Sequence, residues 1–524
     1  MRRTLLAMLL LAGCAGGGGV TGLPTPSIAM RPEDRVLLGD FSRVTAVAAS
    51  YDRVYVSYPT ALAIWRPLTQ RWDVPRSPGN PSALQSVIGG AIDPVDQSVW
   101  LATSTGWVHY QPDIDRWDAA NIATHVTGIA VDPNNAGAGI WFRTSSGWLL
   151  QQRVGPAFPG SPPATLRLPP TINDAYADVP QLRSLSPRLL TGPLMAQGTF
   201  TAAAPNTQGT GWFLGTTNRG LLFFDRTAIE ARPMPLGLPG DVVGALAATP
   251  DGIWVVTDAS ARVPAGVTFL SGDLAQASGI PGSAVFGLPF DAARYVLPGD
   301  RALWLATEKG LVRESLDDGK LTRWDMSQGL PDNRVTAVAQ VKGRIVAGTM
   351  RGLVNVGGDD KITRRALSYD GPVYALKAND DTLWVGTAFG MWASLVGDDS
   401  LRMPEGFRQQ GMIPPVLGIG YVGDTLVAMT PDHLVWRNPE SGVWTRGPDL
   451  AQQLGPLTSF AATPQGVWVG GLRGAGFVRP TTAVLRLLMV GGDLPAEVTS
   501  IVVSGGYLWV GTVGGLVRIR LEGR

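Results

Sequence analysis

The residues that could carry chemistry are few and lie far apart along the chain. Its three histidines, His109, His125 and His433, fall in different segments, and none has a cysteine or an acidic residue nearby at the spacing of a metal site. Adjacent aspartates occur four times beside Gly, Lys, Asn or Ser, a composition typical of turns, at residues 317–318, 359–360, 380–381 and 398–399. We therefore predict no catalytic residue, no metal site and no cofactor.

Three further patterns are weak. A calcium-binding loop would need alternating oxygen ligands and a distal Glu, and these aspartate pairs lack them. Residues 471–476 are rich in glycine, as nucleotide-binding loops are, but no helix is expected after them. No serine lies in the strand–turn–helix pattern of a hydrolase nucleophile. The sequence therefore favours a protein that recognises a partner over one that catalyses a reaction.

The beginning of the chain predicts export. Two arginines follow Met1, and the apolar stretch at 5–11 is too short for a membrane-spanning helix, a combination typical of a secretory signal peptide. Leu11-Ala12-Gly13-Cys14 resembles a bacterial lipobox, which implies cleavage before Cys14 and a lipid on its thiol. An ordinary signal peptide with an incidental cysteine is the alternative. Ala15 stands where such lipoproteins often carry an inner-membrane retention Asp, so the resemblance implies the outer membrane.

Composition favours a repetitive all-β chain. The 524 residues include Gly 66 and Pro 41, and only 16% are charged. With Lys+Arg 43 and Asp+Glu 42 the net charge is +1, which argues against a nucleic-acid partner. We expect a signal peptide at 1–13, a Gly- and Pro-rich tether at 14–34, and a folded part at 35–524.

One phrase recurs about every 42 residues. It consists of an apolar residue, Trp, an apolar residue, a small residue and Thr, followed after two or three positions by Gly and an apolar residue. Clear copies begin at Leu383 and Leu508. Eleven periods result when the Trp-equivalent position serves as the marker, at residues 55, 100, 141, 212, 254, 304, 345, 384, 426, 468 and 509.

Each period predicts four short antiparallel strands. Residues 333–340 alternate apolar and polar side chains, as a half-buried strand does, and the Trp phrase forms the next strand. A sheet of this kind cannot bury both of its faces alone, whereas sheets stacked radially can. The predicted fold is therefore an all-β propeller of four-stranded blades.

The periods resemble the two-component-regulator propeller repeats of bacterial extracytoplasmic sensor regions. We interpret the Trp residues as filling the space between blades and the small residues as allowing close approach of another backbone. These structural positions are Trp212, Trp254, Trp304, Trp384, Trp468, Trp509, Gly215, Gly348, Gly386 and Gly511. Full sensor proteins also carry a membrane helix and an output domain, which this sequence lacks, so the resemblance leaves a direct signalling role in doubt.

The two ends complete one another in this interpretation. The last period has three strands and ends at 516–521, and an orphan strand at 35–40 precedes the first period. Pairing the two would close a ring and remove exposed sheet edges. One ring of eleven blades and two adjoining rings, for example of five and six, both remain open.

One period is about 30 residues longer than the others. The extra residues fall at about 155–197, where apolar residues recur at helical spacing but Pro180 and Pro187 interrupt any long helix. A strap packed on the rim and a partner-binding arm both fit this segment.

Three functions fit these features. The first is a non-catalytic, lipid-anchored scaffold or binding module for an envelope protein or glycan, held on the membrane through Cys14. The second is an extracytoplasmic ligand-sensing propeller, and the third is a propeller lyase or hydrolase acting on a saccharide.

Overall fold

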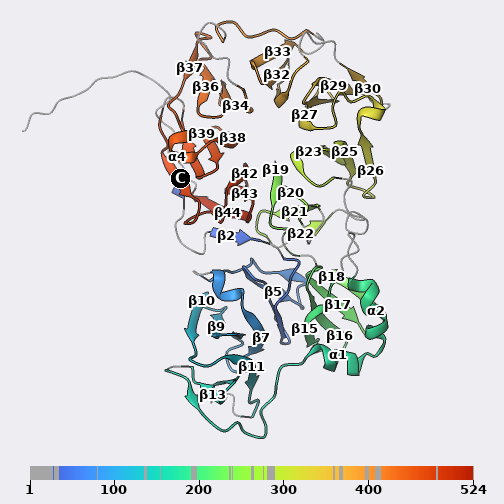
Figure 1. The fold of residues 1–524 in the computed structure, drawn as a ribbon, viewed down its shortest axis with the longest axis vertical. Helices are drawn as coiled ribbons and strands as arrows, with labels where there is room; N and C mark the ends of the chain where they lie inside the picture. Colours follow the sequence, from blue (N-terminus) through green and yellow to red (C-terminus); the bar gives the residue numbers. More distant parts are fainter. Residues whose placement is uncertain are drawn as a thin grey trace, which may run out of the picture.

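A computed structural model gives the fold. It describes residues 27–28, 35–39, 41–78, 81–134, 139–153, 155–190, 197–234, 236, 238, 240–260, 265–274, 277–279, 290–357, 360–364, 370–379, 381–395, 400–407, 415–479 and 482–522. The described part is built almost entirely of antiparallel sheets, eleven in number, nearly all of them four-stranded. These sheets fall into two groups, which we call the four-sheet unit and the seven-sheet unit (Figure 1).

The four-sheet unit contains strands β3 to β18, two α-helices and one 3₁₀ turn. Its strands are β3 (Ala46–Ala49), β4 (Val54–Ser57), β5 (Leu62–Arg66), β6 (Arg71–Trp72), β7 (Val87–Ile92), β8 (Val99–Thr103), β9 (Gly106–Gln111), β10 (Arg116–Asn121), β11 (Val126–Val131), β12 (Ile140–Thr144), β13 (Gly147–Gln151), β14 (Phe158–Pro159), β15 (Phe200–Pro205), β16 (Gly211–Thr216), β17 (Leu221–Asp225) and β18 (Glu230–Met234). Its helices are η2 (Pro81–Leu84), α1 (Ile172–Asp178) and α2 (Gln181–Leu190), of which η2 is a single 3₁₀ turn.

The seven-sheet unit contains strands β19 to β44 together with β1 and β2. Its strands are β19 (Val243–Thr249), β20 (Gly252–Thr257), β21 (Gly266–Ser271), β22 (Ala277–Gly279), β23 (Ala293–Pro298), β24 (Ala302–Thr307), β25 (Gly310–Ser315), β26 (Leu321–Trp324), β27 (Val335–Val341), β28 (Arg344–Thr349), β29 (Gly352–Val356), β30 (Ile362–Arg364), β31 (Val373–Ala378), β32 (Thr382–Thr387), β33 (Gly390–Leu395), β34 (Gly418–Val422), β35 (Thr425–Met429), β36 (Leu434–Arg437), β37 (Trp444–Arg446), β38 (Leu457–Thr463), β39 (Gly466–Gly471), β40 (Gly474–Val478), β41 (Arg486–Met489), β42 (Val498–Ser504), β43 (Tyr507–Thr512), β44 (Gly515–Glu522), β1 (Ser27–Ile28) and β2 (Arg35–Leu38). The short helices η4 (Met326–Gln328) and α4 (Ala451–Leu454) complete it.

The sheets of the seven-sheet unit follow one another in a circle. The first strand of each sheet contacts the first strand of the next, from β19 through β23, β27, β31, β34 and β38 to β42, and β42 contacts β19. Thr499 Oγ1 donates to the carbonyl of Val243, 2.6 Å away, across this last junction. The order of contacts therefore returns to its start after seven sheets.

The outer strand of the last sheet comes from the beginning of the described chain. β2 pairs antiparallel with β44, with Arg35 opposite Ile519 and Leu38 opposite Leu516. Val36 and Leu38 are buried there. This is the pairing that the sequence suggested between 35–40 and 516–521. It makes the seven-sheet unit discontinuous in sequence, because the whole four-sheet unit lies between β2 and β19.

The four-sheet unit is arranged differently. Its inner strands contact one another in the order β11, β7, β3 and β15, so the fourth sheet packs beside the first. The amide of Val44 donates to the carbonyl of Thr216, 2.8 Å away, at this junction. The sheets β11–β14 and β15–β18 then stand at the two ends of an arc (Figure 1).

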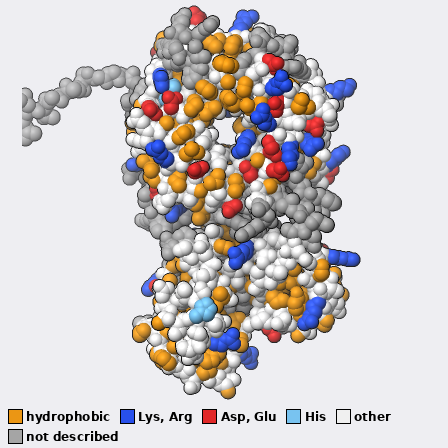
Figure 2. Space-filling view, viewed as in Figure 1, with side chains coloured by type: hydrophobic (Ala, Val, Ile, Leu, Met, Phe, Trp, Pro, Cys, Tyr) orange, Lys and Arg blue, Asp and Glu red, His pale blue; other side chains and the backbone are white. Residues whose placement is uncertain are grey.

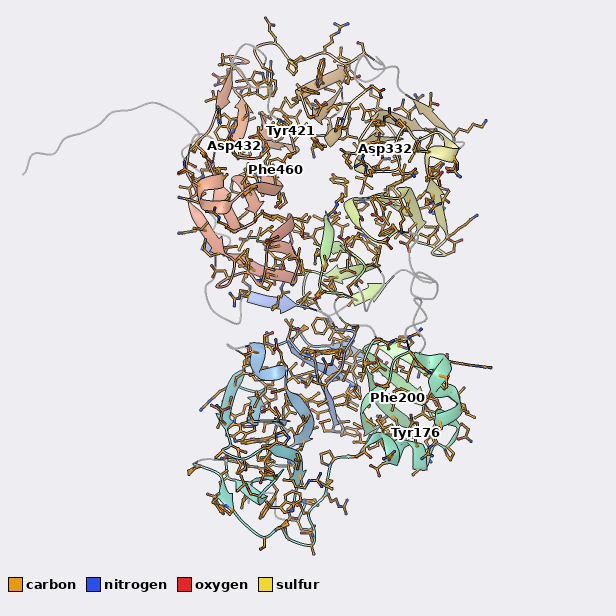
Figure 3. The ribbon with its side chains drawn as sticks, in the orientation of Figure 1. Tyr176, Phe200, Asp332, Tyr421, Asp432 and Phe460 are labelled. Carbon is orange, nitrogen blue, oxygen red and sulfur yellow. The ribbon has the colours of Figure 1, made fainter. Side chains whose placement is uncertain are left out.

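The long insertion covers both ends of the arc. Ala175, Val179 and Leu182, from α1, α2 and the turn between them, are buried against the face of β15–β18, and Tyr176 meets Phe200 edge to face at 6.4 Å (Figure 3). At the other end, Leu166 packs on Trp141, and Gly160 lies against the same indole. Among the described residues, neither cluster includes a side chain of the opposite end sheet. The insertion therefore substitutes for a neighbouring sheet, as capping repeats do.

The contacts thus divide the eleven sheets into seven and four. The sequence left one ring and two rings open, and its example of five and six differs from this division. The predicted helical interruption occurs at Pro180, where α1 and α2 are separate, but Pro187 lies inside α2.

Candidate functional site

The Thr of the repeated phrase closes a tight turn in five of the described sheets, at residues 144, 307, 349, 387 and 512. Its hydroxyl donates to the carbonyl of the Gly three residues later, for example from Thr307 to Gly310 at 2.7 Å and from Thr387 to Gly390 at 3.0 Å. Both threonines are fully buried. The sequence showed the Thr as part of the phrase but assigned it no role, and its role is to hold the turn that joins the second and third strands.

The glycine before this Thr lies against the neighbouring sheet. A Cβ placed on Gly215, Gly348 or Gly511 would lie 2.5–2.6 Å from a valine side chain in, or just before, the first strand of the adjoining sheet. A Cβ on Gly386 would meet the carbonyl oxygen of Val416 at 2.6 Å. Ordinary side-chain contacts are longer than this, so a larger residue would push the two sheets apart.

The tryptophans of the phrase contribute to the packing between sheets. Trp468 and Trp509 are fully buried, and the others pack in clusters that combine two adjacent sheets. Trp384 also donates its indole N–H to the Tyr421 hydroxyl, 2.8 Å away on the next sheet. Figure 3 places Tyr421 and Phe460 on the neighbouring sheets β34–β37 and β38–β41.

Trp212 differs from the other tryptophans. It lies four residues before Thr216, whereas the repeat tryptophans at 254, 304, 384 and 509 lie three residues before their Thr, so Phe213 occupies the repeat position. Since alternate residues of a strand face opposite sides, Trp212 points the other way and donates to Asp178 of α1 at 2.8 Å. The sequence interpretation of Trp212 as an inter-blade residue is therefore corrected, because it packs on the insertion.

The remaining predicted residues do not assemble into a centre. Cys14 lies outside the described residues. His109 is buried, stacks on Trp100 at 3.9 Å and bonds Ser98, and burial lowers the pKa of its imidazole. His433 is buried in a turn, and His125 is exposed. Among the residues that the structure describes, no group of three His, Cys, Asp or Glu could hold a metal ion.

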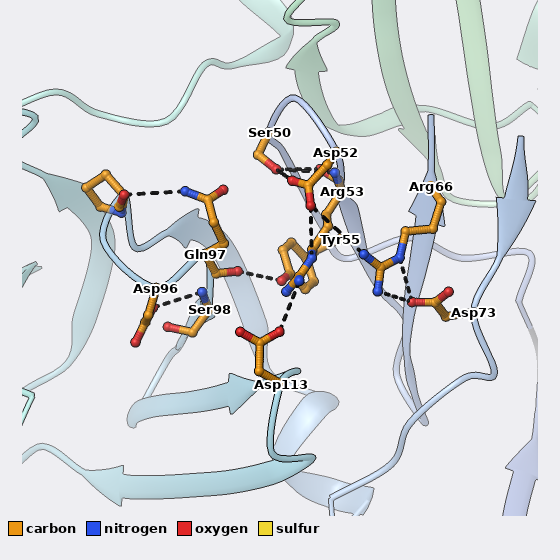
Figure 4. A network of polar contacts seen from close by, with 11 residues as sticks. Ser50, Asp52, Arg53, Tyr55, Arg66, Asp73, Asp96, Gln97, Ser98 and Asp113 are labelled. Atoms are coloured by element: carbon orange, nitrogen blue, oxygen red, sulfur yellow. Dashed lines mark hydrogen bonds and ion pairs between the residues drawn. The ribbon is translucent and has the colours of Figure 1, made fainter. Parts of the chain in front are cut away.

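A polar network joins the first two sheets of the four-sheet unit (Figure 4). Tyr55 marks the first repeat, and its hydroxyl donates to the carbonyl of Gln97 at 2.5 Å on the next sheet. Arg53 lies between Asp52 and Asp113, at 3.3 and 3.0 Å. These contacts hold two sheets together, so we interpret the network as structural.

A cavity of about 450 Å³ lies where the two units meet. Of the residues that the structure describes, the four-sheet unit contributes Arg71 of β6, and the seven-sheet unit provides turns from its first and last sheets. The lining residues are Arg71, Asp251, Ser271, Gly272, Asp273, Gly505 and Tyr507. Gly505 and Gly506 both have positive φ, at 60° and 79°, which allows the tight turn before Tyr507 and leaves no side chain over it.

The groups in this cavity are polar, with one aromatic ring. Arg71 faces Asp273 at 3.5 Å, and Ser271 donates to the same carboxylate at 2.7 Å. Asp251 adds a second carboxylate from the turn between β19 and β20. The cavity thus combines a guanidinium, carboxylates, a hydroxyl and a phenol ring.

Arg518 supports this cavity from behind. Its guanidinium lies 4.4 Å from the centre of the Tyr507 ring and donates to the Gly272 carbonyl at 2.7 Å. The side chain is buried, and within the described part of the chain its Nε has no hydrogen-bond partner. Burial lowers the pKa of this guanidinium, which nevertheless stays charged because the free value is so high. Arg518 therefore fixes the first sheet to the last and holds Tyr507 in place.

Sequence reasoning missed this cavity. Its lining residues come from three different repeats, at 71, 251–273 and 505–507, and no local spacing connects them. Lysine, arginine and acidic side chains are interspersed on the face of the seven-sheet unit that Figure 2 shows.

No helix among the described residues is long and apolar enough to cross a membrane.

Comparisons with known proteins give the fold context. No family model and no curated protein matches the chain. Among solved structures, it is similar to the extracellular domain of the putative hybrid two component system BT4673 from B. thetaiotaomicron, with 13% identity, a TM-score of 0.39, and coverage of 94% of this chain and 68% of that one.

Two other solved structures are similar to different extents. PorZ, a bacterial surface component of the type-IX secretion system of Porphyromonas gingivalis, has 11% identity and a TM-score of 0.42 over 91% of this chain and 69% of its own. Virginiamycin B lyase from Staphylococcus aureus has 14% identity and a TM-score of 0.43 over 54% of this chain and 96% of its own. At such identities and TM-scores no function follows from the likeness.

Proposed function

We propose that the protein is a non-catalytic binding module of the bacterial cell envelope, anchored through a lipid on Cys14. In this proposal the seven-sheet unit is a closed β-propeller, the four-sheet unit is a capped partial propeller, and the cavity between them takes a small polyhydroxylated ligand such as a saccharide unit of an envelope glycan. The order of sheet contacts supports the propeller, since it returns to its start.

The observation that carries the ligand class is the composition of the cavity. Planar guanidinium and carboxylate groups form paired hydrogen bonds with neighbouring hydroxyls, and the ring of Tyr507 offers an apolar face to the C–H side of a sugar. Arg71 and Asp273 balance each other and Asp251 adds a further carboxylate, which disfavours an anionic ligand. A volume of about 450 Å³ is in the range of small-molecule sites.

Binding to soluble oligosaccharides tests this proposal. The protein with Cys14→Ala, which removes the lipid attachment, is titrated with a panel of neutral and acidic oligosaccharides by saturation-transfer NMR and calorimetry. Tyr507→Ala should weaken binding by about tenfold or more. Gly272→Leu should block it, because a side chain at Gly272 meets open space in the cavity.

Tyr51→Ala is the matched control, since Tyr51 is an exposed tyrosine of the four-sheet unit away from the cavity. Binding that survives both cavity variants would contradict the assignment of the site. The anchor is tested separately by metabolic labelling with a fatty acid, where label that persists in Cys14→Ala would contradict the lipid attachment.

A further inference from the structure

The outer strand β41 carries an unusual row of exposed apolar side chains. Leu485, Leu487 and Met489 alternate along this edge and are 38%, 41% and 40% exposed, and we call them the β41 row. Their own sheet does not cover them, because Gly476 and Gly474 of β40 stand opposite Leu487 and Met489. Exposed apolar residues gathered in this way mark a contact surface.

The strands β40 and β41 carry basic but no acidic side chains, and the nearest carboxylate is that of Asp493, which accepts from the Met489 amide at 3.0 Å and lies 4.0 Å from Arg35. Residues 472–489 contain three arginines and no acidic residue. Arg473 and Arg486 are exposed beside the row. Elsewhere in the molecule, the outer strands β10 and β18 present mainly polar or small side chains to solvent. Apolar side chains flanked by arginines are typical of surfaces that lie on anionic lipid headgroups.

The chain enters the fold beside this row. β1 and β2 lie along β44, in the sheet next to β38–β41, and Leu488 packs in the same cluster as Ile519 of β44. Arg35 donates to the carbonyls of Gly492 and Asp493, each 3.1 Å away, directly after β41. Only twelve residues separate Cys14 from Ser27, so even a fully extended tether spans at most about 45 Å.

From these observations we infer that the β41 row rests on the bilayer surface and binds anionic lipid headgroups. The short tether brings the membrane to the side of the seven-sheet unit that carries β1, β2 and β41, and the row supplies the apolar and basic groups that such a surface binds. This inference rests on the proposed lipid anchor, but its test does not, because it uses protein without the lipid.

The test uses the full chain with Cys14→Ala, which contains no other cysteine. Co-sedimentation is measured with vesicles of phosphatidylglycerol and phosphatidylcholine, and with vesicles of phosphatidylcholine alone. Replacing all three residues of the row by Ser should lower partitioning into the anionic vesicles at least about tenfold. Leu395→Ser, at a leucine of β33 that is 62% exposed, is the matched control and should leave partitioning unchanged.

A fluorescent label provides a second measurement that does not depend on removing the row. In the same background, Leu487→Cys and Leu395→Cys each carry one thiol for an environment-sensitive dye. Vesicles should shift the emission of the label at 487 to the blue and leave the label at 395 unchanged. Arg473→Gln with Arg486→Gln should weaken binding to anionic vesicles alone.

Three results would overturn the inference. They are equal partitioning of the parent and the triple Ser variant, equal dye shifts at the two positions, or self-association through the row without vesicle binding, which would make a second copy its partner. Failure of fatty-acid labelling alone would refute the anchor, whereas failure of vesicle binding with labelling intact would refute only the role of the row.

Discussion

The two units solve the same packing problem in different ways. Each is built from sheets with two apolar faces, and each must cover the faces at the ends of its series. The seven-sheet unit returns to its start and completes its last sheet with β2. The four-sheet unit stops short of closing and covers its end sheets with the segment that holds α1 and α2. A sheet face can therefore be buried either by another sheet or by helices, as long as the covering element presents apolar side chains to it.

Because of this difference, the two units should lose their folded structure in different ways. A ring whose outer strand comes from a distant part of the chain depends on one long-range pairing. An arc with a local cap depends on contacts between residues close in sequence, since the cap directly precedes the sheet β15–β18. We expect substitutions at the closure to affect the seven-sheet unit as a whole, and substitutions at the cap to affect one end of the arc.

Breaking the closure should have the largest effect. Val36→Asp combined with Leu38→Asp places two carboxylates in the apolar seam with β44 and should reduce the free energy of unfolding by more than about 4 kcal/mol. Urea denaturation followed by tryptophan fluorescence measures this change. Leu68→Asp, at an exposed leucine of the four-sheet unit, is the control, and equal midpoints for the two proteins would argue against closure by β2.

Weakening the contact between α2 and the sheet β15–β18 should lower the free energy of unfolding by less, and its effect should stay local. Leu182 is fully buried between α2 and the sheet β15–β18, so Leu182→Ala should cost about 2–5 kcal/mol. Hydrogen exchange should show lost protection in β15–β18 and unchanged protection in β43 and β44. Leu168→Ala, at an exposed position of the same insertion, should have little effect. Loss of protection across both units would contradict the independence of the arc.

Glu314 tests the burial of a carboxyl group inside the seven-sheet unit. It is fully buried in β25, neither carboxylate oxygen has a hydrogen-bond partner among the described residues, and burial raises its pKa to about 7. The folded protein therefore holds this proton up to about pH 7, whereas the unfolded chain loses it near the ordinary Glu value of about 4.3. Stability should fall as the pH rises between these values and stay reduced above them.

Glu314→Gln should remove this pH dependence and raise the free energy of unfolding at pH 8 by about 3 kcal/mol. Thermal and urea unfolding between pH 4.5 and 8 measure the effect. Glu440→Gln, at an exposed residue, is the control. A parent protein whose stability is the same at pH 5 and pH 8, once the control is subtracted, would show that the carboxylate is not buried as described.

The smallest expected change in stability compares the contacts between neighbouring sheets in the two units. Gly386→Ala would bring a Cβ against the backbone carbonyl of Val416, whereas Gly215→Ala would meet the movable side chain of Val44. We expect a loss of about 2 kcal/mol for the first and about 1 kcal/mol for the second, because an arc can also open slightly. Gly272→Ala, which meets open space, is the control in thermal unfolding. Equal losses of stability at Gly386 and Gly215 would mean that the contacts between neighbouring sheets are equally rigid in the two units.

The sequence predicted the local structure well and the arrangement of sheets only in part. The repeated phrase located the second strand of almost every sheet, because Thr and Gly determine a turn within a few residues. It could not show that the circle ends after seven sheets, since each repeat presents the same kinds of side chain to any neighbour. Trp212 shows a further limit, because a shift of one residue relative to its Thr reverses the face it occupies.

Neither the cavity nor the β41 row could be predicted from the sequence, for a related reason. Arg71 and Tyr507 are 436 positions apart, and only the closing of the seven-sheet unit brings their segments together. The glycines opposite the row leave it exposed, and nothing in the sequence of β41 alone says which strand lies beside it.

The strand β2 also sets the order in which the protein can be completed. β2 emerges early from the ribosome, but its partner β44 is the last described strand to appear, so this pairing cannot form until synthesis of the described chain is nearly finished. The four-sheet unit, which lies entirely between them in sequence, has all its strands and its cap available long before. During synthesis the smaller unit can therefore fold while the larger one waits, and a chain that ends before β44 leaves β2 without its partner strand.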